Sequence, residues 1–218
     1  MGFSESELPL FPLNVVLFPQ MVLPIHVFEE RYKEMVSACM EGDSRFGVVL
    51  IKEGDESGEP AVPCDVGTVA RIRRVSRLDD GRLNILVLGE SQFRIMEMTQ
   101  WRPHERAIVS FPDEVAGDPP PSPEEVEGMR ISLQSYMRTL LGLRGGWVRE
   151  VPSPTDPVAL SFYVGSVLRG EAEERQRILE ATTAAERLAM LVPVLQREEL
   201  RIRSRLERLL LLDGLRLN

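Results

Sequence analysis

The most informative stretch of the sequence is residues 8–32, which read LPLFPLNVVLFPQMVLPIHVFEERY. Its first part, Leu8–Leu13, alternates leucine with proline and phenylalanine. Because proline lacks an amide donor, we expect this strand at a sheet edge or with irregular pairing. Val15–Phe18 is a second apolar run. The apolar residues within 25–36 then recur every three to four positions, which predicts an amphipathic helix.

The region that follows, as far as residue 112, reads as short strands separated by turns. Strands are expected at Phe46–Ile51, Gly67–Ser76, Leu83–Leu88, Phe93–Met98 and Ala107–Phe111. Asp80-Gly81 between two of these runs is a strong hairpin signal. Strands at this spacing predict a small, strongly curved barrel.

A proline-rich segment, residues 113–123, separates the strand region from a helical one. Its core, DPPPSP at 118–123, cannot form helix interior or a central strand. Helices are expected from Pro123 towards Gly142, from Pro157 to Gly170 at the latest, over Glu173–Ala181, and from Thr183 through Leu212. The chain is therefore expected to be an α+β protein with a barrel at 1–112, a linker at 113–123 and a helical bundle at 124–218.

The last helix has the clearest pattern of the helical region. Thr183 and Glu186 have the spacing of a capping box at its start. Pro193 is expected to kink the helix or to break it in two. One apolar stripe follows the helix and either packs in the bundle or forms a dimer seam or coupling surface; it comprises Leu188, Leu191, Val192, Leu195, Ile202, Leu206, Leu209 and Leu210.

The composition argues against several classes of protein. The net charge is -8, which disfavours nucleic acid or an anionic membrane as a partner. No apolar run approaches the roughly 20 residues of a membrane-spanning helix. Two cysteines and the absence of a signal-peptide pattern indicate a reducing cytoplasm.

One basic cluster favours an alternative. Arg71, Arg73, Arg74 and Arg77 crowd one predicted strand. Simple alternation places the first, second and fourth on one face, where they could meet phosphates or pair with nearby acids. RNA binding therefore remains an alternative, although no aromatic residues interleave the arginines.

Several short motifs occur in a recognisable order. They are Leu8–Leu13, Val16–Pro19, Leu23-Pro24 and Phe28-Glu29-x-Arg31-Tyr32, followed by Gly67–Ala70, Asp80-Gly81-Arg82, Gly89 and Phe93–Ile95. In this order they resemble the N-terminal substrate-binding domain of Lon protease. Glu30 and Gln92 stand where that family usually has proline and arginine, which indicates a divergent branch.

The resemblance implies a PUA-like β-barrel with one or two helices, followed by a C-terminal helical bundle that ends in a long helix. It also implies a free-standing module that captures unfolded or specific polypeptides for a separate ATPase and protease. The family-motif residues are expected to be mainly structural: Leu10, Pro12, Pro19, Pro24, Phe28, Glu29, Arg31, Tyr32, Gly67, Gly81 and Gly89. Phe28, Tyr32, Leu10 and Phe18 are expected in the core.

Polypeptide binding is expected in a groove between barrel and bundle. The loop 18–23 is the best candidate, because its adaptable apolar groups are flanked by stiffening prolines. The expected binding residues are Phe18, Met21, Val22 and Leu23.

The sequence shows no pattern for catalysis. Its two lysines, Lys33 and Lys52, lie outside any phosphate-binding Gly-x4-Gly-Lys-Ser/Thr loop, so neither a nucleotide site nor a Ser–Lys dyad is expected. The two histidines and the two cysteines lack metal-ligand spacing, and we expect no metal and no cofactor. Cys39 and Cys64 are expected to be buried apolar residues. Two alternatives stay open beside RNA binding: an adaptor that joins a protease or ligase through the last helix, and an enzyme with a hidden site.

Overall fold

The computed structural model describes residues 5–143 and 146–216, with side chains as far as residue 208. Its elements in chain order are β1 (Glu5–Leu13), β2 (Val22–Val27), α1 (Glu30–Glu41), β3 (Arg45–Glu53), β4 (Val62–Arg77), β5 (Leu83–Gln100), β6 (Arg106–Ser110), α2 (Pro123–Gly142), α3 (Pro157–Val167), α4 (Ala172–Glu180) and α5 (Ala184–Arg216). Contacts divide the chain into a sheet unit (Met1–Asp113 with Ala172–Glu180) and a helical unit (Glu114–Glu171 with Ala181–Asn218). The expected three-part division at 112 and 124 stays a prediction.

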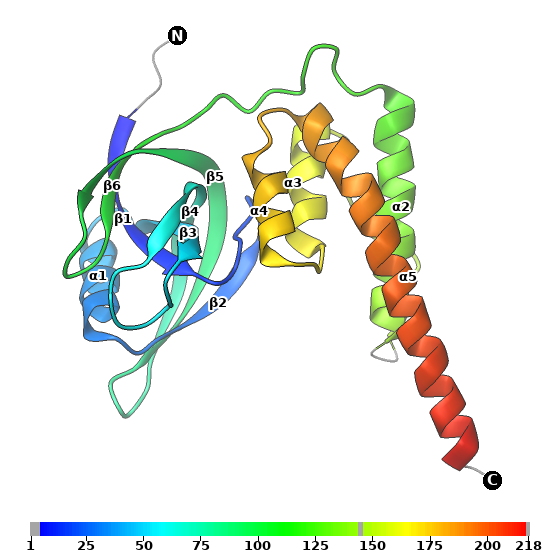
Figure 1. Ribbon diagram of the computed structural model, residues 1–218, viewed down its shortest axis with the longest axis horizontal. Coiled ribbons are helices and arrows are strands. Elements are labelled where there is room, and N and C mark those ends of the chain that lie inside the picture. Colours follow the sequence, from blue (N-terminus) through cyan, green and yellow to red (C-terminus); the bar gives the residue numbers. More distant parts are fainter. Residues whose placement is uncertain (1–4, 144–145, 217–218) are drawn as a thin grey trace. The chain divides into compact units, whose positions relative to one another are not determined.

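The sheet unit is a ring of strands with one strand attached outside it. The strand order is β2-β5-β4-β3-β1-β6, and β5 also pairs with β6, which closes the ring (Figure 1). The long strand β5 makes this closure possible. Its first half pairs with β2 and β4, and its second half pairs with β6. The expected barrel is therefore confirmed, and β2 pairs with β5 alone.

Leu8–Leu13 does not form a sheet edge, because β1 lies between β3 and β6, but its pairing is irregular, which was the other expectation. Its two halves pair on different sides: Glu5–Pro9 with β6, and Leu10–Leu13 with β3. The Leu10 amide donates to the Glu105 carbonyl on the β6 side. Successive residues of a strand direct their backbone nitrogens to opposite neighbouring strands. The Pro12 nitrogen is therefore directed to the β6 side and the Pro9 nitrogen to the β3 side, and neither residue is paired on that side. Each proline is thus at a local edge.

The helix expected within 25–36 begins later than its periodicity indicated. Residues as far as Val27 form strand β2, and α1 runs from Glu30 to Glu41. The buried positions of β2 alternate, as in a half-buried strand. A second correction concerns Leu83–Leu88 and Phe93–Met98, which are parts of one strand with irregular pairing rather than two strands.

Two apolar clusters stabilise the sheet unit. One includes Leu10, Phe93 and Val109. The other lies beneath α1, where Tyr32 stacks on Phe11 with ring centroids 4.1 Å apart. Leu10, Phe18 and Tyr32 are buried, as expected.

Helix α4 belongs to the sheet unit although it follows α3 in sequence. The side-chain amide of Gln92 donates to the Leu179 carbonyl at 2.6 Å, and the side-chain amide of Gln176 donates to the Val66 carbonyl at 2.9 Å. Both side chains are buried. These two hydrogen bonds attach α4 to β4 and β5.

The helical unit consists of α2, α3 and α5. The helix starts follow the expected capping chemistry. Ser122 and Glu125 form a capping box, Asp156 caps α3, and the Thr183 hydroxyl accepts from the Glu186 amide at 3.2 Å. The Glu186 carboxylate instead accepts from the Thr182 amide, so only half of the expected capping box forms at α5.

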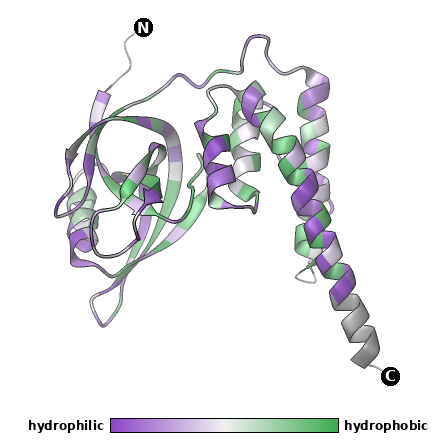
Figure 2. Cartoon of the chain, viewed as in Figure 1, coloured by the Kyte–Doolittle hydropathy of each residue, from purple (hydrophilic) through white to green (hydrophobic). Residues whose placement is uncertain are grey.

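Helix α5 continues through Pro193, so it is not broken in two, and a kink at this residue stays a prediction. Green and purple residues interleave along it in Figure 2, as an amphipathic helix requires. Leu188, Leu191 and Leu195 are buried, whereas Val192 is 37% exposed. Ile202 and Leu206 are half-buried, and the side chains of Leu209 and Leu210 lie outside the described residues.

Candidate functional site

One apolar surface of the sheet unit lies on the face of β2 and β5 that points away from the core. Val22, Pro24 and His26 are exposed along β2, and the residues between them are buried or half-buried. The register places Leu88 opposite Val22 and Leu86 opposite Pro24. We call this surface the β2–β5 strip and define it as Val22, Pro24, His26, Phe28, Leu86 and Leu88.

Three large side chains make the strip apolar. Val22 is 55% exposed, Phe28 53% and Leu86 36%. His26 bridges the two strands, because its Nδ1 lies 2.8 Å from Oδ1 of Asn84. The His26 ring also stacks with Phe28, with centroids 6.2 Å apart. Apolar side chains exposed together on one face of a sheet make that face a candidate interaction surface.

The loop before β2 is held rigidly against β5. The Gln20 amide donates to the Gly89 carbonyl at 2.8 Å, and the Gly89 amide donates to the Met21 carbonyl at 2.9 Å. A Cβ at Gly89 would lie 2.2 Å from the Phe18 carbonyl oxygen, so only glycine permits this approach. These contacts fix the position of the loop directly before Val22, the first residue of the strip.

The four expected binding residues do not form one surface. Phe18 is buried, and the Arg175 guanidinium of α4 lies 5.3 Å from its ring centroid. Met21 and Leu23 are half-buried and pack against the core beneath α1. Only Val22 is mainly exposed. Leu86 and Phe28 join Val22 in the strip, and they were not expected there.

The expectation that Phe28 lies in the core is wrong. It follows the last residue of β2, outside both β2 and α1, and is turned outward. The neighbouring motif residues do pack as a brace: Arg31 Nε bonds Glu29 at 3.1 Å, and its guanidinium lies 4.5 Å from the Tyr32 ring centroid. The motif thus combines a structural part with one exposed aromatic ring.

The remaining motif residues have backbone or packing roles. Pro12 and Pro19 are buried, whereas Pro24 is exposed on the strip. A Cβ at Gly67 would lie 2.5 Å from the Val48 carbonyl oxygen. Gly81 has a φ of 82° in the β4–β5 turn, a conformation that favours glycine.

Comparison with known proteins identifies this fold and its motifs. Residues 7–197 match the family model described as the ATP-dependent protease La (LON) substrate-binding domain. The chain belongs to this family.

Full-length relatives of this Lon-family domain are much longer than it. The Lon protease of Cytophaga hutchinsonii is 30% identical over 200 residues, which cover 88% of this chain and 24% of that protein. The Lon protease of Desulfovibrio desulfuricans is 30% identical over 201 residues, covering 88% and 22%. The chain therefore spans about a quarter of the Lon proteases that it matches.

Two solved structures have a similar fold. A Lon N-terminal domain protein from Xanthomonas campestris is 25% identical, with a TM-score of 0.61, over 86% of this chain and 98% of that one. The N-terminal domain of the Mycobacterium avium complex Lon protease has a TM-score of 0.62 over 88% and 98%, at 21% identity, and shows the fold alone.

The Lon-family domain also contains a buried acid that the sequence analysis missed. Glu105 is inaccessible, accepts a hydrogen bond from the Tyr32 hydroxyl at 3.1 Å, and lies 3.8 Å from the Arg31 guanidinium. Burial raises the pKa of the Glu105 carboxyl and also that of Tyr32. The group connects α1 to β6 and has no access to a substrate. No sequence signal marks it apart from its position one residue before β6.

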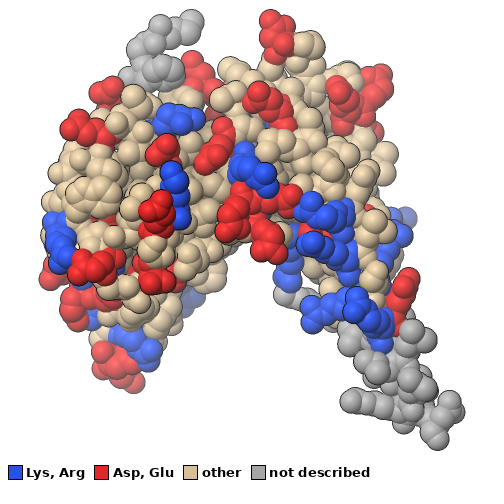
Figure 3. Space-filling model, in the orientation of Figure 1, with Lys and Arg blue, Asp and Glu red and all other residues tan. Residues whose placement is uncertain are grey.

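The arginine cluster is arranged differently from the simple alternation. A register shift between Ile72 and Arg74 places Arg74 opposite Leu86, while Arg71 lies opposite Leu88. Both therefore border the strip, and Arg77 lies on the other face, opposite Leu83. Arg71 and Arg45 pair with the same carboxylate, Glu90. On the face shown in Figure 3, acidic and basic side chains are interspersed over the sheet unit.

Neither cysteine has the lowered thiol pKa of a reactive nucleophile. Cys39 is buried, and burial raises the pKa of its thiol to about 11. Cys64 is half-buried, less than expected, and burial raises its thiol pKa as well. A raised pKa leaves little nucleophilic thiolate at neutral pH.

Neither a metal cluster nor a membrane-spanning helix is found in the part of the chain that the structure describes. Among the residues whose side chains the structure describes, no three histidine, cysteine or carboxylate groups are close enough to hold a metal. None of the helices in the described part of the chain is both long and apolar enough for a membrane crossing.

Proposed function

We propose that this Lon-family domain binds exposed apolar segments of other polypeptides on the β2–β5 strip and catalyses no reaction itself. The observation that carries the proposal is the exposure of Val22 and Leu86 on the outward face of the paired strands β2 and β5, with Phe28 exposed directly after β2. Substrate binding in the family's description supports the same role. The absence of a phosphate-binding loop in the 218 residues supports a role through binding alone.

The strip favours contact through side chains over addition of a complete strand. Strand β2 has β5 as its one strand partner among the described elements, so its other edge is open in the sheet. The Met21 carbonyl accepts from β5, which turns the backbone groups of Val22, Pro24 and His26 to the open edge. Pro24 has no amide to offer there, and this interrupts a continuous ladder with a bound strand.

The expected affinity is modest. Fully burying one valine, leucine or phenylalanine is worth about 1.5–3 kcal/mol, and these side chains are already about half covered. Three half-contributions sum to roughly 2–5 kcal/mol before the cost of association, so these contacts alone give a dissociation constant on the order of millimolar or weaker. Such binding is reversible, as delivery of a captured chain to another machine requires.

The test is a titration of a permanently unfolded, alkylated model protein, labelled with a fluorophore, without nucleotide. We expect the native chain to bind it, and Val22→Asp and Leu86→Asp each to weaken binding about tenfold, because a carboxylate in an apolar contact is unpaired. Val62→Asp is the matched control. Val62 is a valine 42% exposed at the start of β4, remote in register from the strip.

The outcomes separate clearly. Native affinity in Val62→Asp with loss in both strip variants supports the proposal. Equal affinity in all four proteins, or no binding by the native chain, would overturn it. Circular dichroism of each variant confirms that the fold is retained.

A further inference from the structure

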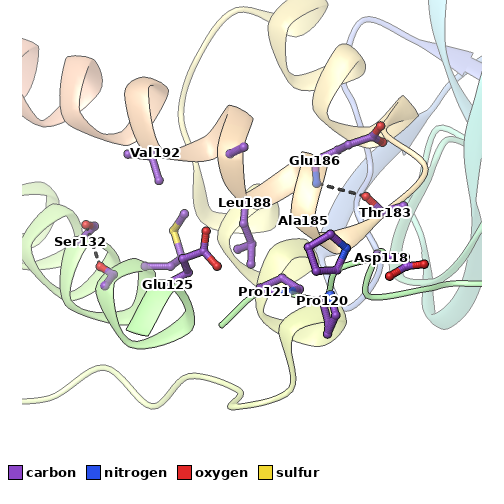
Figure 4. A pocket seen from close by; sticks show the side chains of 15 residues that line it. Asp118, Pro120, Pro121, Glu125, Ser132, Thr183, Ala185, Glu186, Leu188 and Val192 are labelled. Atoms are coloured by element: carbon purple, nitrogen blue, oxygen red, sulfur yellow. Dashed lines mark hydrogen bonds between the residues drawn. The ribbon is translucent and has the colours of Figure 1, made fainter. Parts of the chain in front are cut away.

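The helical unit contains an open groove of about 670 Å³ between the first halves of α2 and α5 (Figure 4). Helix α2 contributes Gly128, Met129 and Ser132, and α5 contributes Ala185, Leu188 and Val192. Prolines 119–121 form a third side. Met129 and Leu188 are buried and give an apolar floor, while Val192 is partly exposed at the rim.

Gly128 leaves the α2 wall of the groove without a side chain at this position. It lies inside α2, where glycine is less favourable than alanine, yet a Cβ at this position would meet no atom within 4 Å. Packing against this chain therefore does not explain the glycine. The Ser132 hydroxyl turns back to the Gly128 carbonyl at 2.9 Å, so it does not fill the space either. A bare helix wall permits close approach of another backbone.

The groove is formed before any ligand arrives. The Ala184 and Ala185 amides donate to the Val115 and Ala116 carbonyls, each at 2.9 Å, and this fixes the segment before the prolines on α5. Gly117 has a φ of 117°, and its Cβ would lie 3.0 Å from the Ala185 side chain. A rigid, preformed site loses little conformational entropy on binding.

The ionisable groups that line the groove are all acidic: Asp118, Glu125 and Glu186. Glu125 and Glu186 also bond the starts of their own helices. Asp118 is exposed and has no hydrogen-bond or ion-pair partner among the residues described. The two helix N-termini offset roughly one unit of this negative charge, about +0.5 each, so the groove stays negative. The nearby Arg187 points away, onto the Phe162 ring.

One main-chain acceptor adds to this pattern. Pro193 lies inside α5 and has no amide, so the carbonyl of Ala189 lacks its α-helical donor. Ala189 lines the groove. A carbonyl without its helical donor keeps the capacity to accept a hydrogen bond.

We propose that this groove is a second polypeptide site, which takes a short apolar segment carrying lysine or arginine. The apolar floor receives the apolar side chain, and the acidic rim receives the cation. The inference rests on the general polypeptide-binding role proposed above but does not depend on the β2–β5 strip.

The experiment uses the full chain and two labelled peptides, Gly-Leu-Ala-Arg-Leu-Gly and the same peptide with glutamate in place of arginine. Fluorescence anisotropy measures both affinities at low salt. We expect the arginine peptide to bind at least about tenfold more tightly, with the preference reduced in Asp118→Asn and by added salt.

Gly128→Phe is expected to lower affinity for the arginine peptide about tenfold by filling the groove, whereas Gly128→Ala should stay near native affinity. Ala189→Lys provides an independent block through charge if the phenylalanine variant fails to fold. Val62→Asp, which lies outside both the groove and the strip, should leave binding of the arginine peptide unchanged. Equal binding of both peptides, or native affinity in folded Gly128→Phe or Ala189→Lys, would contradict the proposal.

Discussion

Glu105 is the carboxyl that the fold removes most completely from water. It is inaccessible, with the Tyr32 hydroxyl at 3.1 Å, the Arg31 guanidinium at 3.8 Å and the backbone amides of Glu105 and Ala61 as polar neighbours. Burial raises its pKa above the ordinary value of 4.5 more strongly than these neighbours lower it. The folded state therefore holds this proton at a higher pH than the unfolded chain does.

The sign of the pH dependence follows from this difference. A carboxyl with a raised pKa in the folded state contributes stability at low pH, and that contribution is lost as the pH rises from about 4.5 through the folded-state pKa. Glu105→Gln keeps an acceptor for Tyr32 and removes the titration. We expect native stability to fall relative to Glu105→Gln as the pH rises above about 4.5, measured by urea unfolding at each pH. A constant difference, or one of opposite slope, would show that burial does not dominate.

At the scale of elements, Gly89 joins the loop before β2 to β5. Its amide and carbonyl both bond residues of that loop, and a Cβ would overlap the Phe18 carbonyl at 2.2 Å. The contact involves backbone, which cannot move as a flexible side chain can. Gly89 thereby sets the position from which Val22 enters the strip.

We expect Gly89→Ala to lower the free energy of unfolding by about 2 kcal/mol or more, as overpacking against backbone does. Gly42→Ala is a suitable control in the same unit, because its Cβ would make ordinary contacts at 3.7 and 3.8 Å. Chemical denaturation measures both. Similar stabilities for the two variants would mean that the loop adjusts easily and does not hold the strip.

Elements with strong local signals were predictable from sequence, and pairings over long distances were not. The starts of α2 and α3 follow from Ser122-Pro123 and Asp156-Pro157, which act within one turn. The start of α1 was predicted too early, because Val27 and Phe28 fit a helical period. In the structure the residues as far as Val27 pair with β5 instead. Arg74 changed face because one irregularity shifts every residue after it.

At the scale of the whole chain, the two candidate surfaces differ in how far sequence could reveal them. Val22 was found through its proline-flanked loop. Leu86 lies 64 positions later and joins it only through the β2–β5 register, which places it opposite Pro24. Gly128 gives no sequence signal, because a helical glycine is informative only once the open space beside it is known. The chemistry of helix caps and turns is local, whereas binding surfaces arise from tertiary structure.

The central claim concerns where an unfolded polypeptide contacts this domain. A photo-crosslinking amino acid placed at position 22, on the strip, and at position 62, outside it, reports that contact directly. With the alkylated unfolded protein and no nucleotide, we expect strong crosslinking from position 22 and background crosslinking from position 62. Equal yields from the two positions, or a higher yield from position 62, would contradict the account.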